Sequence, residues 1–371
     1  MKKIASTVLL AVMLFSLCST TALADVSTIV YVNGVKLQTD TPPVIINDRT
    51  YVPFRAIAEA LGCVVGYDET TKTVTMEGGG VSLMLTVGSN EAVVNGAKVM
   101  MDTPAMIVNN RTMVPIRFVS ETFRGNVKWT PGYDEDWGMA DNFVRIFSEF
   151  PVTVKPLGIG VYSKCFQYKA NIGYQDGDMM TAFYDLVMPQ FSGLGDGDFQ
   201  AELNDDILKQ FEAIDSDVRE NEREQKEDAD GYYYTYSEEL DYSLLGVRGD
   251  ILAVMQEGYW YAGGAHGMPN RTVMNIDIAR NKVLQLPDLF KGANFEQRLL
   301  NEINALRDAE SEYEGEIDVV TGFPLDGSFY FDGNTLVVFY HPYDLASYAR
   351  GFVEFKIPLA NLLEILKDEY K

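Results

Sequence analysis

One stretch of this sequence occurs twice, and the duplication limits what the first third of the chain can fold into. Without a gap, nearly half of the positions from Val32 to Val65 carry the same residue 62 positions later. Internal duplication of this kind indicates one supersecondary unit that is used twice. Each copy is small for a stable core, so we expect the two copies to pack together as one domain.

Both copies show the same order of turns and short elements. Asn-Gly pairs at 33–34 and 95–96 predict hairpin turns, because both central positions of such a turn need a positive φ. A proline then predicts a short helix at 53–61 and again at 115–123, since its missing N–H costs nothing in the first helical turn.

The two predicted helices differ in the residue that follows them. Gly62 suits the left-handed backbone position just past the end of the first helix. Arg124 stands at the equivalent position of the second copy, followed by Gly125. We therefore expect the second helix to end differently from the first.

The repeated motifs are Val-Asn-Gly and Asn-x-Arg-Thr-x-Val-Pro-x-Arg, the latter at 47–55 and 109–117. In both copies these residues resemble the copper amine oxidase N-terminal domain, often called the stalk domain, over about residues 28 to 148. Copper amine oxidase activity belongs to a separate domain with three histidine ligands, and the whole chain has two histidines. The resemblance therefore implies presentation of a neighbouring domain, and we expect no copper and no other cofactor.

The chain begins with the features of a secretory signal peptide. Lys2 and Lys3 precede an apolar run from Val8 to Leu17, and small residues end in Ala22-Leu23-Ala24. We expect a signal peptide at 1–24 and an extracellular or wall-associated protein, without lipid on Cys18 because Leu17 precedes it. No later segment reaches about 18 uninterrupted apolar residues, so we expect no membrane span in the mature chain.

Charge and cysteine content exclude several classes of protein. The chain has 30 basic and 54 acidic residues, a net charge of −24, which argues against a nucleic-acid partner. Three cysteines are too few for a disulfide framework or a zinc ribbon. We expect Cys63 and Cys165 to be buried free thiols.

A long acidic helix is predicted after the middle of the chain. Residues 196–230 contain 14 acidic and 4 basic residues, and apolar residues recur every three or four positions between Phe199 and Val218. The apolar stripe predicts packing on a sheet. The acidic face is suited to a cationic protein partner, with lysozyme-like enzymes as the specific hypothesis.

The rest of the second half alternates between strands and glycine turns. Its hallmarks are Gly-Gly-Ala-His-Gly at 263–267, Leu-Pro-Asp-Leu-Phe at 286–290 and Tyr-x-x-Ala-x-Tyr-Ala-x-Gly at 343–351. These motifs resemble the paired DUF4163 and DUF3298 domains of secreted bacterial proteins, which we assign to 150–257 and 258–371. The same pair precedes the catalytic domain of a peptidoglycan deacetylase and forms the extracellular part of a lysozyme-sensing anti-sigma factor of bacilli.

These patterns predict an α+β protein. Two small sheet-plus-helix units form a stalk domain at 25–149, and an antiparallel sheet packed with helices follows. We interpret the chain as a secreted, non-enzymatic binding protein whose partner is a cationic protein or peptidoglycan. The alternatives are a wall-active hydrolase or deacetylase and a structural spacer.

Four residues are candidates for contact with the partner: Trp260, Tyr261, His266 and Tyr343. Three glycines around His266 allow the backbone to turn sharply and approach a ligand. Under the enzymatic alternative, His266 is the general base, and Asp250, Asp277 or Asp344 would have to orient it. No spacing brings these residues together, and a zinc site would also need His341.

Overall fold

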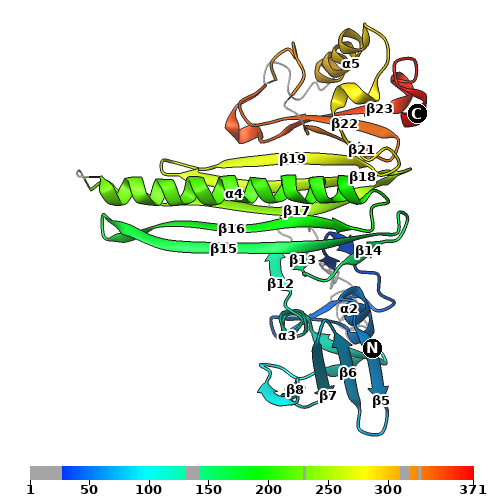
Figure 1. Cartoon of the computed structure of the whole chain (residues 1–371), viewed down its shortest axis with the longest axis vertical. Coiled ribbons are helices and arrows are strands. Elements are labelled where there is room, and N and C mark those ends of the chain that lie inside the picture. Colours follow the sequence, from blue (N-terminus) through cyan, green and yellow to red (C-terminus); the bar gives the residue numbers. More distant parts are fainter. Residues whose placement is uncertain (1–26, 131–141, 229–230, 310–316, 325–326) are drawn as a thin grey trace, which may run out of the picture.

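The computed structural model describes residues 27–130, 142–228, 231–309, 317–324 and 327–371. The predicted signal peptide at 1–24 lies outside this part of the chain. Figure 1 shows three layers along the longest axis: the duplicated region at one end, a long sheet with helix α4 in the middle, and a small sheet with helix α5 at the other end. Among the described residues, no helix is both long and apolar enough to cross a bilayer.

The duplicated region consists of short strands and two short helices. Its elements are β1 (Thr28–Val32), β2 (Val35–Lys36), β3 (Val44–Ile46), β4 (Arg49–Pro53), α2 (Phe54–Ala60), β5 (Val64–Asp68), β6 (Thr73–Gly78), β7 (Val81–Thr86), β8 (Glu91–Val94), β9 (Ala97–Met100), β10 (Met106–Val108), β11 (Arg111–Pro115), α3 (Ile116–Thr122), β12 (Asn126–Thr130) and β13 (Asn142–Phe147). The Asn-Gly turns have the positive φ angles that the sequence predicts.

The two copies interlock. One sheet has the order β5-β6-β7-β8-β9 and another has the order β12-β13-β1-β2, so each joins the hairpin of one copy to later strands of the other. The copies also meet where β4 pairs with β11, and Val52 lies opposite its own repeat equivalent, Val114. The duplicated unit therefore packs on itself with an approximate two-fold axis, as a symmetric dimer interface does between chains.

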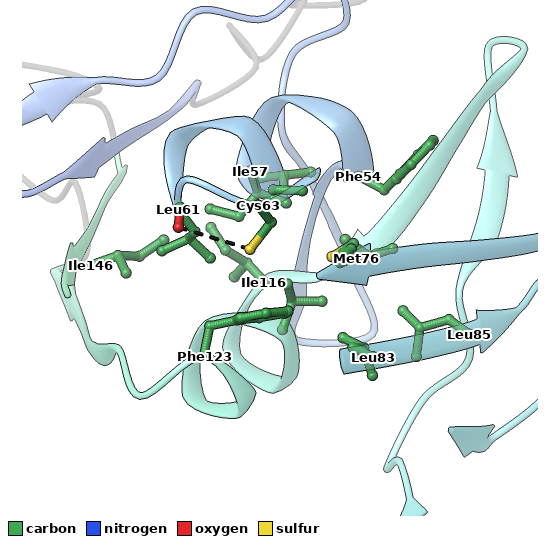
Figure 2. Packing of buried hydrophobic residues seen from close by; sticks show 14 of the residues in the cluster. Phe54, Ile57, Leu61, Cys63, Met76, Leu83, Leu85, Ile116, Phe123 and Ile146 are labelled. Carbon is green, nitrogen blue, oxygen red and sulfur yellow. Dashed lines mark hydrogen bonds between the residues drawn. The ribbon is translucent and has the colours of Figure 1, made fainter. Parts of the chain in front are cut away.

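One hydrophobic core serves both copies (Figure 2). Ile57 and Leu61 of the first helix region lie with Ile116 and Phe123 of the second, and all four are almost completely buried. Cys63 is buried in this cluster, and burial raises the pKa of its thiol to about 11.

The second helix ends as the first one does, which corrects the expectation from Arg124. Arg124 has φ +60°, close to the +72° of Gly62. The backbone hydrogen bonds are equivalent: Gly62 and Arg124 donate to the carbonyls of Glu59 and Glu121. The turn is fixed by the helix-end hydrogen bonds and the shared core, so an L-residue is held in a conformation that favours glycine.

A seven-stranded sheet with the order β14-β15-β16-β17-β18-β19-β20 forms the middle layer. Its strands are β14 (Val152–Val154), β15 (Ile159–Gln175), β16 (Asp178–Ser192), β17 (Tyr236–Arg248), β18 (Ile251–Ala262), β19 (Met268–Asp277) and β20 (Lys282–Leu284). Strands β16 and β17 are parallel, and helix α4 (Gly197–Glu227) is the crossover that such a pair requires. The boundary that we assign between 257 and 258 falls inside β18.

Helix α4 packs on the sheet through the predicted apolar stripe. Leu203, Ile207 and Val218 are buried, and Phe199, Phe211 and Ile214 pack beside them. Residues 232–235 do not form a strand, because β17 begins at Tyr236. Side-chain amides bind the backbone there instead: Gln175 accepts from the N–H of Tyr233, and Gln225 accepts from the N–H of Tyr234.

The third layer is a small sheet, β21-β22-β23, with helix α5 on it. Its elements are β21 (Phe329–Asp332), β22 (Thr335–Tyr340), β23 (Val353–Pro358) and α5 (Phe295–Ala309), with single 3-10 turns at Leu286–Leu289, Tyr348–Arg350, Leu359–Asn361 and Asp368–Tyr370. The architecture confirms the predicted α+β class with mostly antiparallel sheets. Both Cys63 and Cys165 are free, but Cys165 is exposed, which corrects the expectation of two buried thiols.

A buried asparagine joins the duplicated region to the long sheet. The amide of Asn33 donates to the carbonyls of Phe150 and Val161 at 2.9 and 3.2 Å. Its carbonyl oxygen accepts from the N–H of Ser148 at 2.7 Å and from the hydroxyl of Ser163 at 2.8 Å. Polar groups this deeply buried are stable only when they are paired, so these bonds fix the contact between the two layers.

Candidate functional site

Aromatic side chains gather where the long sheet meets the C-terminal layer. We call Tyr259, Tyr261, His266, Tyr343 and Tyr348 the aromatic site. Tyr259 and Tyr261 come from the end of β18, His266 from the glycine turn that follows, and the other two from the segment between β22 and β23. Tyr259 is 39% exposed and Tyr343 is 58% exposed. Two large aromatic side chains are thus accessible at this site, where a ligand could reach them.

The glycine turn is held by tyrosine hydroxyls. The backbone N–H of Gly267 donates to the hydroxyl of Tyr259 at 2.7 Å, and the hydroxyl of Tyr261 donates to the carbonyl of Gly264 at 2.9 Å. Gly263 has φ 78° and Gly264 has φ 90°. Residues with a Cβ rarely adopt such values. The turn is therefore braced from β18 rather than being a free loop.

The ring of His266 lies flat on Tyr348. Their centroids are 3.9 Å apart and the ring planes are inclined by 23°. Nδ1 lies 2.9 Å from the carbonyl oxygen of Gly267. Because a carbonyl only accepts, Nδ1 carries the proton, and Nε2 is left as the nitrogen that can accept a proton from a ligand or a water molecule. Burial, followed by the charge of Tyr259 and a hydrogen bond with it, raises the pKa of the Tyr348 hydroxyl.

Tyr343 has a strained backbone. Its φ is 73°. Such a value is an outlier for a bulky side chain. The strain is held by the surrounding turn, in which the N–H of Tyr343 donates to the carbonyl of Ala346 and the N–H of His341 donates to the carboxylate of Asp344. The turn positions the exposed ring of Tyr343 with its centroid 5.8 Å from that of Tyr348. Backbone strain of this kind is concentrated at sites of function.

The structure divides the four predicted contact residues. It brings Tyr261, His266 and Tyr343 to one side of the long sheet but places Trp260 on the other. Successive residues of a strand point to opposite faces, and Trp260 shares its face with Leu252 and Val254, which pack in the core under α4. The two residues that the sequence analysis did not single out are Tyr259, which follows from alternation with Tyr261, and Tyr348, which belongs to the motif at 343–351.

Two of the three carboxylates considered as partners of His266, Asp277 and Asp344, are engaged elsewhere. Asp277 pairs with Arg280 at 3.0 Å, and Asp344 binds the backbone of His341 at 2.8 Å. Nε2 of His341 lies 2.8 Å from the carbonyl oxygen of Arg271, so the two histidines have separate surroundings. Across the ranges that the structure describes, no three His, Cys, Asp or Glu residues are grouped so that they could hold a metal ion.

Three protein families match separate parts of this chain. The copper amine oxidase N-terminal domain matches residues 31–135, the deacetylase PdaC family matches 176–269, and a family of unknown function, DUF3298, matches 287–360. The chain combines all three regions. This confirms the predicted architecture of a stalk followed by paired domains.

One relative acts on the cell wall. The peptidoglycan-N-acetylmuramic acid deacetylase PdaC of Bacillus subtilis strain 168 is 26% identical over 183 residues, covering 46% of this chain. The matched region spans only 38% of the length of that relative. These matches confirm the coarse prediction of a cell-wall-associated protein.

The prediction that the chain is not an enzyme is wrong, because both the family match at 176–269 and the relative are deacetylases. A wall-active hydrolase or deacetylase was the alternative that the sequence left open. Signal-peptide cleavage stays a prediction, as does a lysozyme-like partner.

Two solved structures are also similar. A DUF3298-family protein from Bacteroides fragilis has a TM-score of 0.45 at 19% identity, covering 56% of this chain and 94% of its own. Another from Pseudomonas aeruginosa has a TM-score of 0.42 at 18% identity, covering 57% and 96%.

Proposed function

We propose that this chain takes part in the N-deacetylation of peptidoglycan and that the aromatic site holds the glycan strand. The observation that carries the proposal is the deacetylase match at 176–269, which includes the whole of β18 and the glycine turn with His266. The aromatic site is thus built in part from the region that the chain shares with deacetylases.

The exposed rings suit a sugar chain. The faces of aromatic rings carry partial negative charge, and the C–H groups on one side of a pyranose ring carry partial positive charge. Tyr343 and Tyr259 are both accessible to solvent. The tyrosine hydroxyls and turn carbonyls beside them can exchange hydrogen bonds with sugar hydroxyl and acetamido groups.

His266 is the group that fits the chemistry of amide hydrolysis. Nε2 accepts a proton from a water molecule as the water oxygen bonds to the acetamido carbon. The C–N bond then breaks, the amine nitrogen takes up the proton from Nε2, and acetic acid leaves and gives up its remaining proton to solvent as acetate. Stacking on Tyr348 and the bond from Nδ1 to Gly267 hold the ring in the orientation that this transfer needs.

Release of acetate from purified peptidoglycan tests the proposal. The full chain should release acetate, and His266→Ala should reduce the rate by about 100-fold or more, the usual effect of losing a general base. Tyr343→Ala should weaken binding to insoluble peptidoglycan by about tenfold. Tyr174→Ala is the matched control, because Tyr174 is 70% exposed on β15 and outside the aromatic site.

Two results would overturn the proposal. Failure of the full chain to release acetate would remove the catalytic role. Equal binding by the natural chain, Tyr343→Ala and Tyr174→Ala would remove the aromatic site as the place where glycan binds.

The charge of α4 supports a second candidate role, binding of a cationic protein such as a lysozyme. All four basic residues of the helix pair with helix acids, which leaves a surplus of acidic side chains facing solvent. Such charges chiefly speed association and are screened over about 8 Å at physiological salt. Neutralising four helix acids should therefore slow association with lysozyme and barely change dissociation, and an absence of binding at low salt would end this hypothesis.

A further inference from the structure

The duplicated region contains a groove that the proposed function does not use. We call it the Trp129 groove; its volume is about 680 Å³. The residues of its lining that matter here are Ile45, Arg49, Asp102, Arg117, Glu121 and Trp129. The groove thus combines apolar side chains with two ion pairs, Arg49–Asp102 and Arg117–Glu121.

The indole of Trp129 is open to solvent. It is 48% exposed, and Ile45, which lines the same groove, is 44% exposed. Trp129 lies near the end of β12, whose pairing with β13 fixes its backbone. A large aromatic ring left accessible beside other apolar side chains is characteristic of a surface that meets a ligand.

The approximate two-fold axis produces a second groove of about 540 Å³. Its Arg111, Asp40 and Tyr67 are the repeat equivalents of Arg49, Asp102 and Trp129. The second groove is the smaller of the two. Its Tyr67 packs against Phe54, with ring centroids 6.2 Å apart, whereas the first groove has the smaller Ile116 at the position equivalent to Phe54. The structure thus offers a larger groove and, 62 positions away in sequence, a smaller equivalent that serves as a natural control for it.

We propose that the Trp129 groove binds an uncharged β-linked saccharide, as a second glycan site beside the aromatic site. The choice of a wall glycan rests on the proposed function, but the groove supports a saccharide by its own chemistry. Trp129 supplies a flat apolar surface for one side of a pyranose ring, and the paired charges of the groove supply donors and acceptors for hydroxyl groups.

The charges of the groove favour an uncharged ligand. Two arginines, Arg49 and Arg117, are offset by three acidic residues, and each arginine already has a carboxylate partner. A phosphate polymer would have to break these pairs and enter a surface that is negative overall. A saccharide needs only to exchange hydrogen bonds with them. Because exposed ion pairs contribute little to stability, such an exchange costs little.

A second site for the same polymer would strengthen binding to the wall. Peptidoglycan repeats its saccharide unit, so one strand or two neighbouring strands can occupy both sites at once. Linked sites raise overall affinity well beyond that of either site alone, without any new contact. The duplicated region would then hold the chain on the glycan while the aromatic site works on it.

Calorimetric titration of the full chain with a β-1,4-linked N-acetylglucosamine tetramer tests the inference. Trp129→Ala should weaken one class of sites by about tenfold, and Trp129→Phe should restore most of the affinity. Tyr67→Ala is the matched control in the second groove and should change affinity less than about twofold. Affinity should stay within about twofold between low and high salt, as expected for an uncharged ligand.

The outcomes separate this inference from the proposed function. Binding that depends on Trp129 but not on Tyr343 supports the groove and contradicts a glycan at the aromatic site. Binding that depends on Tyr343 but is unchanged in Trp129→Ala overturns the groove alone. No binding of the tetramer, or a loss of affinity of about tenfold at high salt, overturns the inference, and the acetate assay then judges the proposed function by itself.

Discussion

The two copies of the duplicated unit have the same turn at Asn33 and at Asn95 but use it differently. Asn33 is completely buried, and its side chain makes four hydrogen bonds to groups beyond residue 147. The side chain of Asn95 accepts one bond, from the N–H of Ser82 on a neighbouring strand. One sequence signal for a hairpin thus serves as a local turn in the second copy and as a connection between layers in the first.

The comparison predicts unequal effects when each asparagine is removed. Asn33→Ala leaves several buried polar groups without partners and places alanine at a positive φ, so we expect a loss of about 4 kcal/mol in the free energy of unfolding. Asn95→Ala should cost about 1 kcal/mol, because it loses one exposed bond and the same backbone preference. Urea unfolding of the two variants measures the difference, and equal losses would mean that Asn33 does not join the layers.

A smaller effect is expected at the helix ends. Arg124 and Gly62 share one left-handed conformation. Arg124→Gly should therefore stabilise the protein by about 1 kcal/mol, and Gly62→Ala should destabilise it by about the same amount. A Cβ at residue 62 would meet no atom within 4 Å, so the second change tests backbone conformation alone. Thermal unfolding provides the measurement. Destabilisation by Arg124→Gly would show that the arginine side chain contributes more than its backbone costs.

The smallest effect concerns the reciprocal ion pairs Arg49–Asp102 and Arg111–Asp40. The hydrogen bond from Arg111, together with its charge, lowers the pKa of Asp40 below its ordinary value of 3.8. Because the folded pKa is lowered, the stability from this pair is present above pH 3.8 and is lost as the pH falls through the folded pKa. NMR titration should show Asp40 ionising below its ordinary pKa and returning toward that value in Arg111→Ala. An unchanged pKa in the variant would exclude the pair as the cause.

Local features of the fold could be predicted from the sequence because short-range chemistry determines them. The Asn-Gly turns have the expected backbone angles, and helices α2 and α3 begin after the prolines as expected. The apolar stripe from Phe199 to Val218 packs on the sheet, as its spacing predicts. The interlocking of the copies could not be predicted, since it depends on β1 pairing with β13, at the opposite end of the duplicated region. A repeat shows that a unit is used twice but not whether its hairpin stays with its own copy.

The candidate site likewise could be predicted only where local sequence patterns determine it. Tyr261, His266 and Tyr343 could be found from composition and glycine spacing, and alternation along β18 would have excluded Trp260. The strained φ of Tyr343 and the stacking of His266 on Tyr348 arise from contacts between β18, its turn and the segment after β22. No local pattern specifies those contacts.

Mass spectrometry of muropeptides tests whether this chain acts on peptidoglycan through the aromatic site. Peptidoglycan is incubated with the natural chain or with His266→Ala and then digested. We expect muropeptides that have lost an acetyl group with the natural chain and almost none with the variant. Fully acetylated muropeptides from both, or equal deacetylation by both, would contradict this expectation.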